Sequence, residues 1–201
     1  ITVGTFFMSR AFVLGNGVSR QDVDLNNLKH FGPIYGCNAL YRDFTPTALI
    51  STDKPISERI QDAGYSKNNR FYTRRPVPGS GALPVPQKYF GYSSGPIAAS
   101  IAAIDGARVV YLIGFDMGPA NNHFNNVYAN TEFYKKSSAV PTFTGNWVTQ
   151  IKTVMRDHAG ILFVRIMGHT TAEVADLTRL TNLQTMTMSE FLNRINNTKE
   201  L

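Results

Sequence analysis

The chain has 201 residues, of which 43% are hydrophobic and 17% charged, so it can bury an ordinary core and is not intrinsically disordered. Its formal net charge of +6 favours anionic partners such as nucleotides, nucleic acids or acidic glycans, without choosing among them. A single cysteine, Cys37, excludes an internal disulfide and a cysteine-based metal cage. No apolar run reaches the roughly 18 residues of a membrane span. The single cysteine and the lack of such a run favour a reducing, cytoplasmic setting. Oligomerisation is left open.

The chain begins with Ile1 rather than Met, and Met8 follows closely. Residues 1–7 are too short for a signal peptide and lack its basic leader, so we expect them to be an N-terminal extension. No linker divides the rest of the chain, and its length suits one domain. We therefore expect residues 8–201 to form a single domain.

Three short apolar runs near the start predict buried strands. The first is Ala11–Leu14, which stops at a Gly-Asn-Gly turn. Ile34–Asn38 and Ala48–Thr52 are the second and third. A helix is predicted next, over Pro55–Ala63, because proline suits a first helical turn and a glycine follows the last residue.

The middle of the chain alternates in the same way. Arg70–Thr73 predicts a further strand, and the stretch Val77–Pro86, rich in proline and glycine, predicts a loop. Small residues in Ser94–Ile104 predict a helix that packs closely onto a sheet. Val109–Phe115 is the most apolar run, which suits a central strand of a parallel sheet covered on both faces.

The last third begins with a long polar and aromatic segment, Met117–Phe143, whose length is typical of a functional lid or insertion. Apolar residues spaced from Trp147 to His158 predict an amphipathic helix. Ile161–Met167 predicts another strand, and Met188–Ile195 a closing helix. This alternation predicts an α/β fold, a Rossmann-like, doubly wound, mostly parallel sheet with a long lid-like insertion.

Polar residues gather where the predicted strands end, and ligands bind beyond the carboxyl ends of the strands in such sheets. Glycines let backbone N–H groups approach a ligand, and the start of a helix favours a phosphate. The turn after the first strand is therefore predicted to make room for a nucleotide. The candidate binding residues are Gly15, Asn16, Gly17, Ser19, Asn38, Asp53, Ser93, Ser94, Gly95 and Asp116.

Each of these signals has a purely structural alternative. Asn38 suits a brace for a loop, and Ser94 starts a Ser-Gly-Pro sequence that begins a helix well without any ligand. Asp22 and Asp24 resemble a D-x-D metal motif, but acidic residues are common at helix starts, and no metal site is predicted. The nucleotide interpretation depends on these elements occurring together at one edge of the sheet.

Three stretches between Ala11 and Met117 together resemble the bacterial sialyltransferases of glycosyltransferase family 42. In chain order they contain LGNGVSRQDVDLNNL, IYGCNALYRDF and SSGPIAASIAAIDGARVVYLIGFDM. The chain is also similar to the related Rossmann-like domains of motility-associated, flagellin-modifying proteins, and resembles a phage-borne member of this group. In the sialyltransferases, a G-N-G-x-S turn, a C-N after the second strand and a T/S-S-G before a helix hold a cytidine nucleotide sugar.

The resemblance implies that Asn16 and Asn38 contact the phosphate, ribose or base of the nucleotide. It implies that Ser93, Ser94 and Gly95 line the same cleft. It also implies transfer of the sugar to an acceptor hydroxyl without a metal, with the nucleotide sugar as co-substrate and no other cofactor.

Two features of that family are missing. Gly118 stands where the family has a tyrosine, two residues after the aspartate of the central strand. Residues 144–147 stand where the family has a catalytic histidine before the next helix. The long segment contains candidate replacements: His123 as a base, and Tyr128 and Tyr134 as donors to a leaving phosphate.

Basic residues form two clusters. Arg70, Arg74 and Arg75 flank an aromatic pair, and Lys135 and Lys136 lie in the long segment. Arginine clamps phosphate in a bidentate way, and arginine beside aromatic residues suits stacking against nucleic acid. A solvated edge strand explains the arginine pattern equally well.

We therefore expect a metal-independent glycosyltransferase in which an acceptor hydroxyl attacks the sugar of a CMP-type donor. The positive net charge of the chain favours an anionic acceptor. His123 is the first candidate base and His169 the next. One alternative is a phage accessory or structural protein that binds a nucleotide but has lost catalysis, as the missing histidine and tyrosine suggest. Another is a transferase that acts on modified DNA bases, which the positive charge favours.

Overall fold

One parallel sheet runs through the described part of the chain, residues 9–201 of a computed structural model. The predicted N-terminal extension, residues 1–7, lies outside this part. The strands stand in the order β5-β4-β3-β2-β1-β6-β7-β8, and each neighbouring pair is parallel. They are β1 (Arg10–Leu14), β2 (Ile34–Cys37), β3 (Ala48–Ile50), β4 (Phe71–Thr73), β5 (Leu83–Pro84), β6 (Val109–Ile113), β7 (Leu162–Met167) and β8 (Leu183–Thr187).

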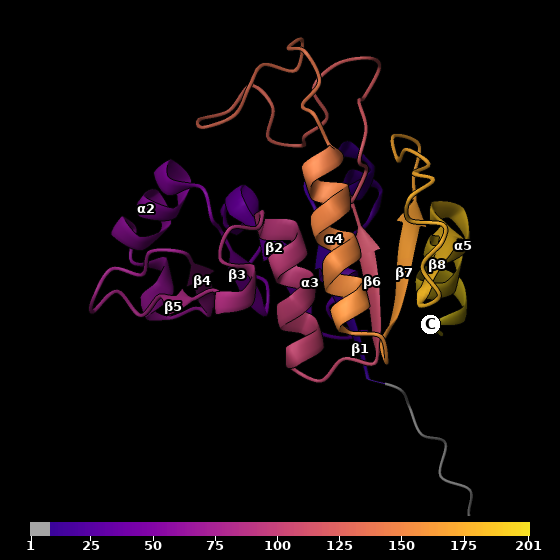
Figure 1. The fold of residues 1–201 in the computed structure, drawn as a ribbon, viewed down its shortest axis with the longest axis horizontal. Coiled ribbons are helices and arrows are strands. Elements are labelled where there is room, and N and C mark those ends of the chain that lie inside the picture. Colours follow the sequence, from indigo (N-terminus) through magenta and orange to yellow (C-terminus); the bar gives the residue numbers. More distant parts are fainter. Residues whose placement is uncertain (1–8) are drawn as a thin grey trace, which may run out of the picture.

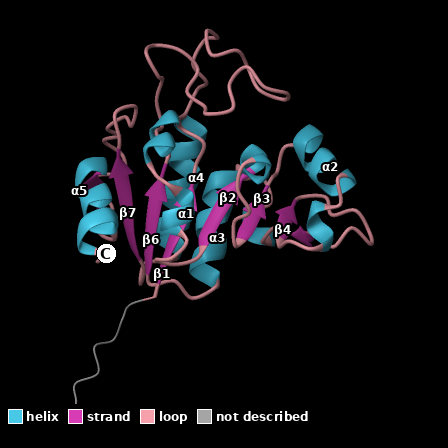
Figure 2. Cartoon of the chain, turned by 180° about the vertical axis from the view of Figure 1, so that it is seen from behind, coloured by secondary structure: helices cyan, strands magenta, loops and turns pink. Residues whose placement is uncertain are grey.

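Helices cover both faces of the sheet. Figure 1 shows α3 and α4 in front of it, and the view from behind in Figure 2 shows α1 and α5 against the other face. Three layers of this kind let every central strand bury both of its faces. The helices are α1 (Leu25–Leu28), α2 (Lys54–Asp62), α3 (Ser94–Ile104), α4 (Gly145–Asp157) and α5 (Met188–Asn193).

Strand β1 divides the core into two halves because its side chains alternate between the faces of the sheet. Ala11 and Val13 pack with α3 and α4, whereas Phe12 and Leu14 pack with the helices of the other face. The alanines of α3, including Ala98 and Ala102, are fully buried against the sheet. Their small size lets this helix lie close to the strands, as its composition predicted.

The strand order reverses beside β1. The chain first builds β2 to β5 on one side of β1, and α3 then brings it back to form β6 on the other side. Leu14 pairs with Ile113, so β1 and β6 end at the same height. A crevice outside the carboxyl ends of two such strands is where doubly wound sheets bind their ligands.

The predicted fold class is confirmed, with a sheet that is parallel throughout rather than mostly parallel. Two strands were missed. The predicted loop Val77–Pro86 contains the two-residue edge strand β5, and β8 forms the opposite edge. Both edge strands carry exposed side chains and lack the continuous apolar run that marks a central strand.

The long segment between β6 and α4 stands above the carboxyl ends of the strands (Figure 1) and forms no helix. It is docked at several points. The N–H of Val127 donates to the carbonyl of Asn16 at 2.8 Å, and Arg59 makes an ion pair with Glu132 at 2.8 Å. The lid-like placement agrees with the sequence, and opening of the segment stays a prediction. Across residues 9–201, no helix is both long enough and apolar enough to cross a membrane.

Candidate functional site

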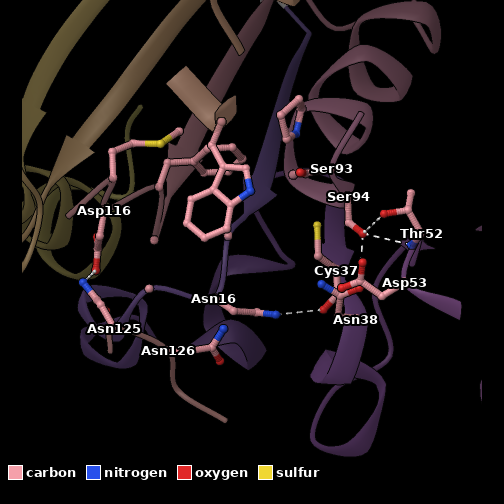
Figure 3. Close-up of a pocket in the computed structure, with 18 of the residues that line it drawn as sticks. Asn16, Cys37, Asn38, Thr52, Asp53, Ser93, Ser94, Asp116, Asn125 and Asn126 are labelled. Atoms are coloured by element: carbon pink, nitrogen blue, oxygen red, sulfur yellow. Dashed lines mark hydrogen bonds between the residues drawn. The ribbon is translucent and has the colours of Figure 1, made fainter. Parts of the chain in front are cut away.

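A cavity of about 280 Å³ lies at the carboxyl ends of β1, β2, β3 and β6, at the point where the strand order reverses. The start of α3, the first turn of α4 and the long segment complete its wall, and Figure 3 shows its polar side chains. The lining residues are Gly15, Asn16, Gly17, Cys37, Asn38, Thr52, Asp53, Ser93, Ser94, Gly95, Pro96, Gly114, Phe115, Asp116, Met117, Gly118, Asn125, Asn126 and Trp147.

Nine of the ten predicted binding residues therefore line one cavity, although they come from five separate parts of the chain. Ser19 is the exception, because it is fully buried beneath the wall. The sequence predicted that the strand ends and the start of α3 meet at one edge of the sheet. This geometry agrees with that prediction.

The glycine turn after β1 exists for backbone packing. The N–H groups of Gly15 and Gly17 donate to the carbonyls of Ile113 and Gly114 at 2.8 and 3.0 Å. A Cβ at Gly15 would lie 2.5 Å from the Gly114 carbonyl oxygen, so only glycine permits the ends of β1 and β6 to approach so closely. The expectation that these two N–H groups face a ligand is therefore not met, since both are already bonded.

Asn16, between these glycines, carries an unusual buried oxygen. Its Nδ2 donates to the carbonyl of Cys37 at 3.1 Å, which ties the end of β1 to the end of β2 (Figure 3). Its Oδ1 is buried and accepts no hydrogen bond from residues 9–201. A buried acceptor without a donor costs free energy, so this atom suits a ligand that brings an N–H or O–H group.

Asn38 adopts a left-handed backbone conformation, with φ of 52°, directly after β2. Its Oδ1 accepts hydrogen bonds from the hydroxyls of Ser51 at 2.9 Å and Ser94 at 3.1 Å. The Ser94 hydroxyl in turn accepts from the N–H of Thr52. With Oδ1 occupied, the Nδ2 group of Asn38 is left without a described protein acceptor on the cavity wall, so it can donate to a ligand.

The start of α3 meets the cavity with unpaired N–H groups. Ser93 occupies the N-cap, and its side chain makes no capping hydrogen bond. The N–H of Ser93 is held by Gln150 Oε1 at 2.8 Å, which positions the helix start against α4. The backbone of Ser94 and Gly95 then presents the positive end of an 11-residue helix to the cavity. Such a helix start stabilises a bound anion.

Asp116 is committed to the protein. Its carboxylate accepts hydrogen bonds from the side chains of Ser19, Asn125, Thr170 and Thr171. This network holds the turn after β1, the long segment and the loop after β7 around the end of β6. Although Asp116 lines the cavity, four side-chain donors occupy its oxygens, so a structural role describes both Asp116 and Ser19 better than ligand binding does.

Tyr128, a predicted catalytic residue, lies away from the cavity. Its hydroxyl donates to Asp43 at 2.8 Å and accepts from Arg20 at 3.2 Å. The guanidinium groups of Arg20 and Arg42 lie over its ring, at 5.6 and 5.9 Å from the ring centre. Burial is the main cause that raises the pKa of Tyr128. The residue anchors the long segment to the body of the protein.

The other predicted catalytic residues also lie off the cavity wall. The Tyr134 hydroxyl accepts from the N–H of Ala39 at 3.4 Å, and burial raises the pKa of Tyr134 to about 12. His123 is exposed, and its Nδ1 forms a hydrogen bond with the carbonyl oxygen of Asn121 at 2.7 Å. His169, the second candidate base, is exposed and lies 3.4 Å from Asp22. None of these side chains therefore faces the cavity directly.

The predicted arginine cluster is largely bonded within the protein. Arg70 forms a bidentate pair with Asp105, and Arg74 donates to the carbonyls of Phe90 and Tyr92 at 2.7 Å each. Arg75 remains exposed. These contacts leave less of the cluster free for a phosphate chain than the sequence suggested.

Trp147, Asn125 and Asn126 line the cavity but were not predicted as site residues. The helical pattern placed Trp147 on a buried face of α4, and nothing in the sequence showed that the first turn of this helix reaches the strand ends. Asn125 and Asn126 lie inside the long segment, whose path depends on contacts such as the Asn125 bond to Asp116. Trp147 adds an aromatic surface to a wall that also includes Phe115 and Met117.

The acidic pair of the D-x-D pattern serves the protein itself. Asp24 caps α1 by accepting from the N–H of Asn26 at 2.9 Å, and Asp22 lies beside His169. Within residues 9–201, no three His, Cys, Asp or Glu side chains gather as a metal site would require.

Comparison with known proteins identifies the fold. No family model matches the chain, and no curated protein matches it. Two solved structures do: the sialyltransferase CST-II in complex with trisaccharide acceptor and CMP, and a mutant of the alpha-2,3/8-sialyltransferase CstII. Their TM-scores are 0.53 and 0.52, each with 11% sequence identity over 87% of this chain and 86% of that chain. The fold therefore resembles that of a bacterial sialyltransferase, as the sequence motifs implied.

Proposed function

We propose that the cavity binds a nucleotide, and that the chain transfers a sugar from a nucleotide donor to an acceptor hydroxyl. One observation carries this proposal. The start of α3 and the free NH₂ group of Asn38 lie together at the point where the strand order reverses. An anion-binding helix start and a directional donor are what a sugar nucleotide needs for its phosphate and its nucleoside. A glycosyltransferase function also agrees with the likeness in fold.

Each part of the wall suits one part of a nucleotide. The N–H groups of Ser94 and Gly95 would hold the phosphate, and Asn38 Nδ2 would donate to an oxygen of the ribose or base. The buried Oδ1 of Asn16 would accept from a ligand O–H or N–H. Trp147 offers a face on which a flat base stacks. The volume lies near the lower end of small-molecule pockets, about 300 Å³, which fits one nucleotide rather than a polymer.

We propose a cytidine nucleotide as the ligand. This choice rests on the G-N-G, C-N and S-S-G motifs and on the fold likeness to a protein that was crystallised with CMP. Transfer of the sugar from a donor of this type releases CMP. The start of α3 would stabilise the phosphate of the departing CMP without a metal. The acceptor would be a hydroxyl compound.

A second candidate function is nucleotide binding without catalysis. It is favoured by the composition of the cavity wall, which contains no histidine, lysine or arginine among its lining residues. A phage accessory protein that binds a nucleotide would need no base. Action on DNA bases, the third interpretation, has less support, because Arg70 and Arg74 bond to protein atoms.

The test uses Trp147, the chain's only tryptophan, as a reporter on the cavity wall. CMP is titrated against UMP, AMP and GMP by fluorescence and by calorimetry, and binding should also raise the melting temperature. We expect CMP to bind tightest. Equal or absent binding would remove the cytidine assignment. CMP binding without release of CMP from any CMP-sugar would favour the non-catalytic alternative.

A further inference from the structure

Asp53 is the free ionisable group of the cavity wall. Three lining side chains can ionise, namely Cys37, Asp53 and Asp116. Asp116 is held by four side-chain donors, and burial raises the pKa of the Cys37 thiol to about 12, which keeps it protonated. The Asp53 carboxylate has no hydrogen-bond or ion-pair partner among residues 9–201, although it stands at the N-cap of α2.

The neighbours of Asp53 do not neutralise its charge. Lys54, the next residue, pairs with Glu58 at 3.7 Å. Arg74 uses its guanidinium on the carbonyls of Phe90 and Tyr92. The carboxylate is exposed and its oxygens accept no hydrogen bond from residues 9–201, so they are free to accept a proton from a ligand.

A second hollow of about 380 Å³ adjoins the cavity at this carboxylate. It lies between the start of α2 and the end of β4, and we call it the side hollow. The side hollow and the cavity share two lining residues, Thr52 and Asp53. Figure 3 shows Asp53 beside Asn38 and Thr52 on the cavity wall. Asp53 therefore stands on the boundary between two spaces, one of which is large enough for a second ligand.

We propose that Asp53 is the general base for sugar transfer, and that the acceptor carbohydrate enters through the side hollow; this rests on the proposed function. The acceptor oxygen forms a bond to the anomeric carbon of the donor sugar. The bond from that carbon to the phosphate oxygen breaks, and its electron pair leaves with CMP. The acceptor's hydroxyl proton moves to a carboxylate oxygen of Asp53. The start of α3 would thus stabilise the leaving group, while Asp53 would take the proton of the nucleophile.

Release of CMP from CMP-sialic acid, with lactose as acceptor, tests this role. Asp53→Ala should lower turnover by about a hundredfold or more, and leave the CMP affinity from Trp147 fluorescence within about twofold. Added formate, a small external carboxylate, should restore part of the turnover in Asp53→Ala and have no such effect on the native chain. Because Asp53 makes no side-chain bond, its removal should not unfold the protein.

Asp62→Ala is the matched control, because Asp62 is an exposed carboxylate at the other end of α2 and lines neither space. It should keep full turnover. Full turnover of Asp53→Ala, or a loss that formate does not restore, would overturn the role of Asp53 while leaving the transferase function standing. A native chain that binds CMP but releases none from the donor would overturn both.

Discussion

Asn38 and Ser94 lie 56 residues apart in the sequence, yet the Ser94 hydroxyl donates to Asn38 Oδ1 across 3.1 Å. Ser94 is the first residue of α3, and Asn38 follows the last residue of β2. The bond therefore fixes a helix start against a strand end. The hydroxyl of Ser51 bonds to the same oxygen, so the amide of Asn38 is oriented with its NH₂ group free.

Replacing Asn38 with aspartate separates these two roles. Asn38→Asp keeps an oxygen for Ser51 and Ser94 and tolerates the left-handed backbone, but it exchanges the free donor for a negative charge. We expect CMP affinity to fall about tenfold or more, because one hydrogen bond is lost and the phosphate is repelled. Fluorescence titration of Trp147 measures the change.

Asn146→Asp provides the control for charge alone. Asn146 is exposed in the first turn of α4, beside Trp147 but outside the cavity lining. Asn146→Asp should leave the CMP affinity within about twofold of the native value, since an exposed charge is screened by solvent. An equal loss in both variants would mean that Asn38 does not contact the nucleotide.

The glycine turn should tolerate no side chain. Gly15→Ala would bring a Cβ within 2.5 Å of the Gly114 carbonyl oxygen, and backbone cannot move aside as a flexible side chain does. We expect the free energy of unfolding to fall by about 1–3 kcal/mol. Gly160→Ala, where a Cβ meets no atom within 4 Å, should change it by less than about 0.5 kcal/mol. Urea denaturation compares the two, and similar losses would contradict the packing explanation.

The central part of the fold was predictable because its strands are continuous apolar runs. Val109–Ile113 and Ala11–Leu14 are buried on both faces, and burial on both faces leaves no polar position to confuse the pattern. The edge strands were not predictable in this way. Leu183–Thr187 is half polar and pairs with a single neighbour, so only its contact with β7 identifies it as a strand.

The candidate site was predictable where it depends on strand ends, and unpredictable where it depends on the long segment. Asn16, Asn38 and Asp53 follow strands directly, so the topology alone brings them together. Tyr128 was expected at the cavity, but two arginines on distant elements hold its ring elsewhere. Trp147 reaches the cavity through the docking of α4, which no local pattern encodes.

Tyr128→Phe should affect stability rather than the chemistry. The change removes a hydroxyl that donates to Asp43 and accepts from the buried Arg20. We expect a loss of about 1–2 kcal/mol in the free energy of unfolding, since the buried guanidinium loses a partner. Tyr41→Phe is the control, because no hydrogen bond to the Tyr41 hydroxyl occurs within residues 9–201. If Tyr128→Phe leaves stability unchanged but lowers turnover, the phenol has a catalytic role after all.

Trp147→Ala should weaken nucleotide binding through loss of a stacking surface. Stacking of a base on an aromatic side chain contributes about 1–3 kcal/mol, so CMP affinity should fall about tenfold, and Trp147→Phe should retain most of it. Calorimetry is the measurement, because these variants lack the fluorescent reporter. The control is Phe143→Ala, a highly exposed aromatic off the cavity wall. Unchanged affinity in Trp147→Ala would exclude stacking.

His158 predicts how stability depends on pH. It is half-buried at the end of α4, its Nε2 has no partner within residues 9–201, and burial lowers its pKa. The nearby charges are Asp157, which opposes this shift, and Lys88, which adds to it. The unfolded chain therefore takes up a proton first, near pH 6.5, and the free energy of unfolding should decrease as pH falls from neutral to about 5.5.

His158→Gln should make that decrease smaller, because the variant has no proton to bind at this position. His30→Gln, at an exposed histidine, should leave the decrease as it is. Denaturant titrations at the two pH values give the comparison. An identical pH dependence in the His158 variant and the native chain would rule out burial of this ring as the cause.

The network around Asp116 also bears on the order in which the protein folds. Ser19 and Asp116 are 97 residues apart, and the bond between Ser19 and Thr171 closes a separation of 152 residues. During synthesis, β1 emerges early but cannot gain its second neighbour until β6 follows, nearly a hundred residues later. Contacts at such separations close large loops and slow folding. Until β6 is synthesised, one side of β1 stays unpaired, and an unpaired strand edge of this kind exposes a nascent protein to aggregation.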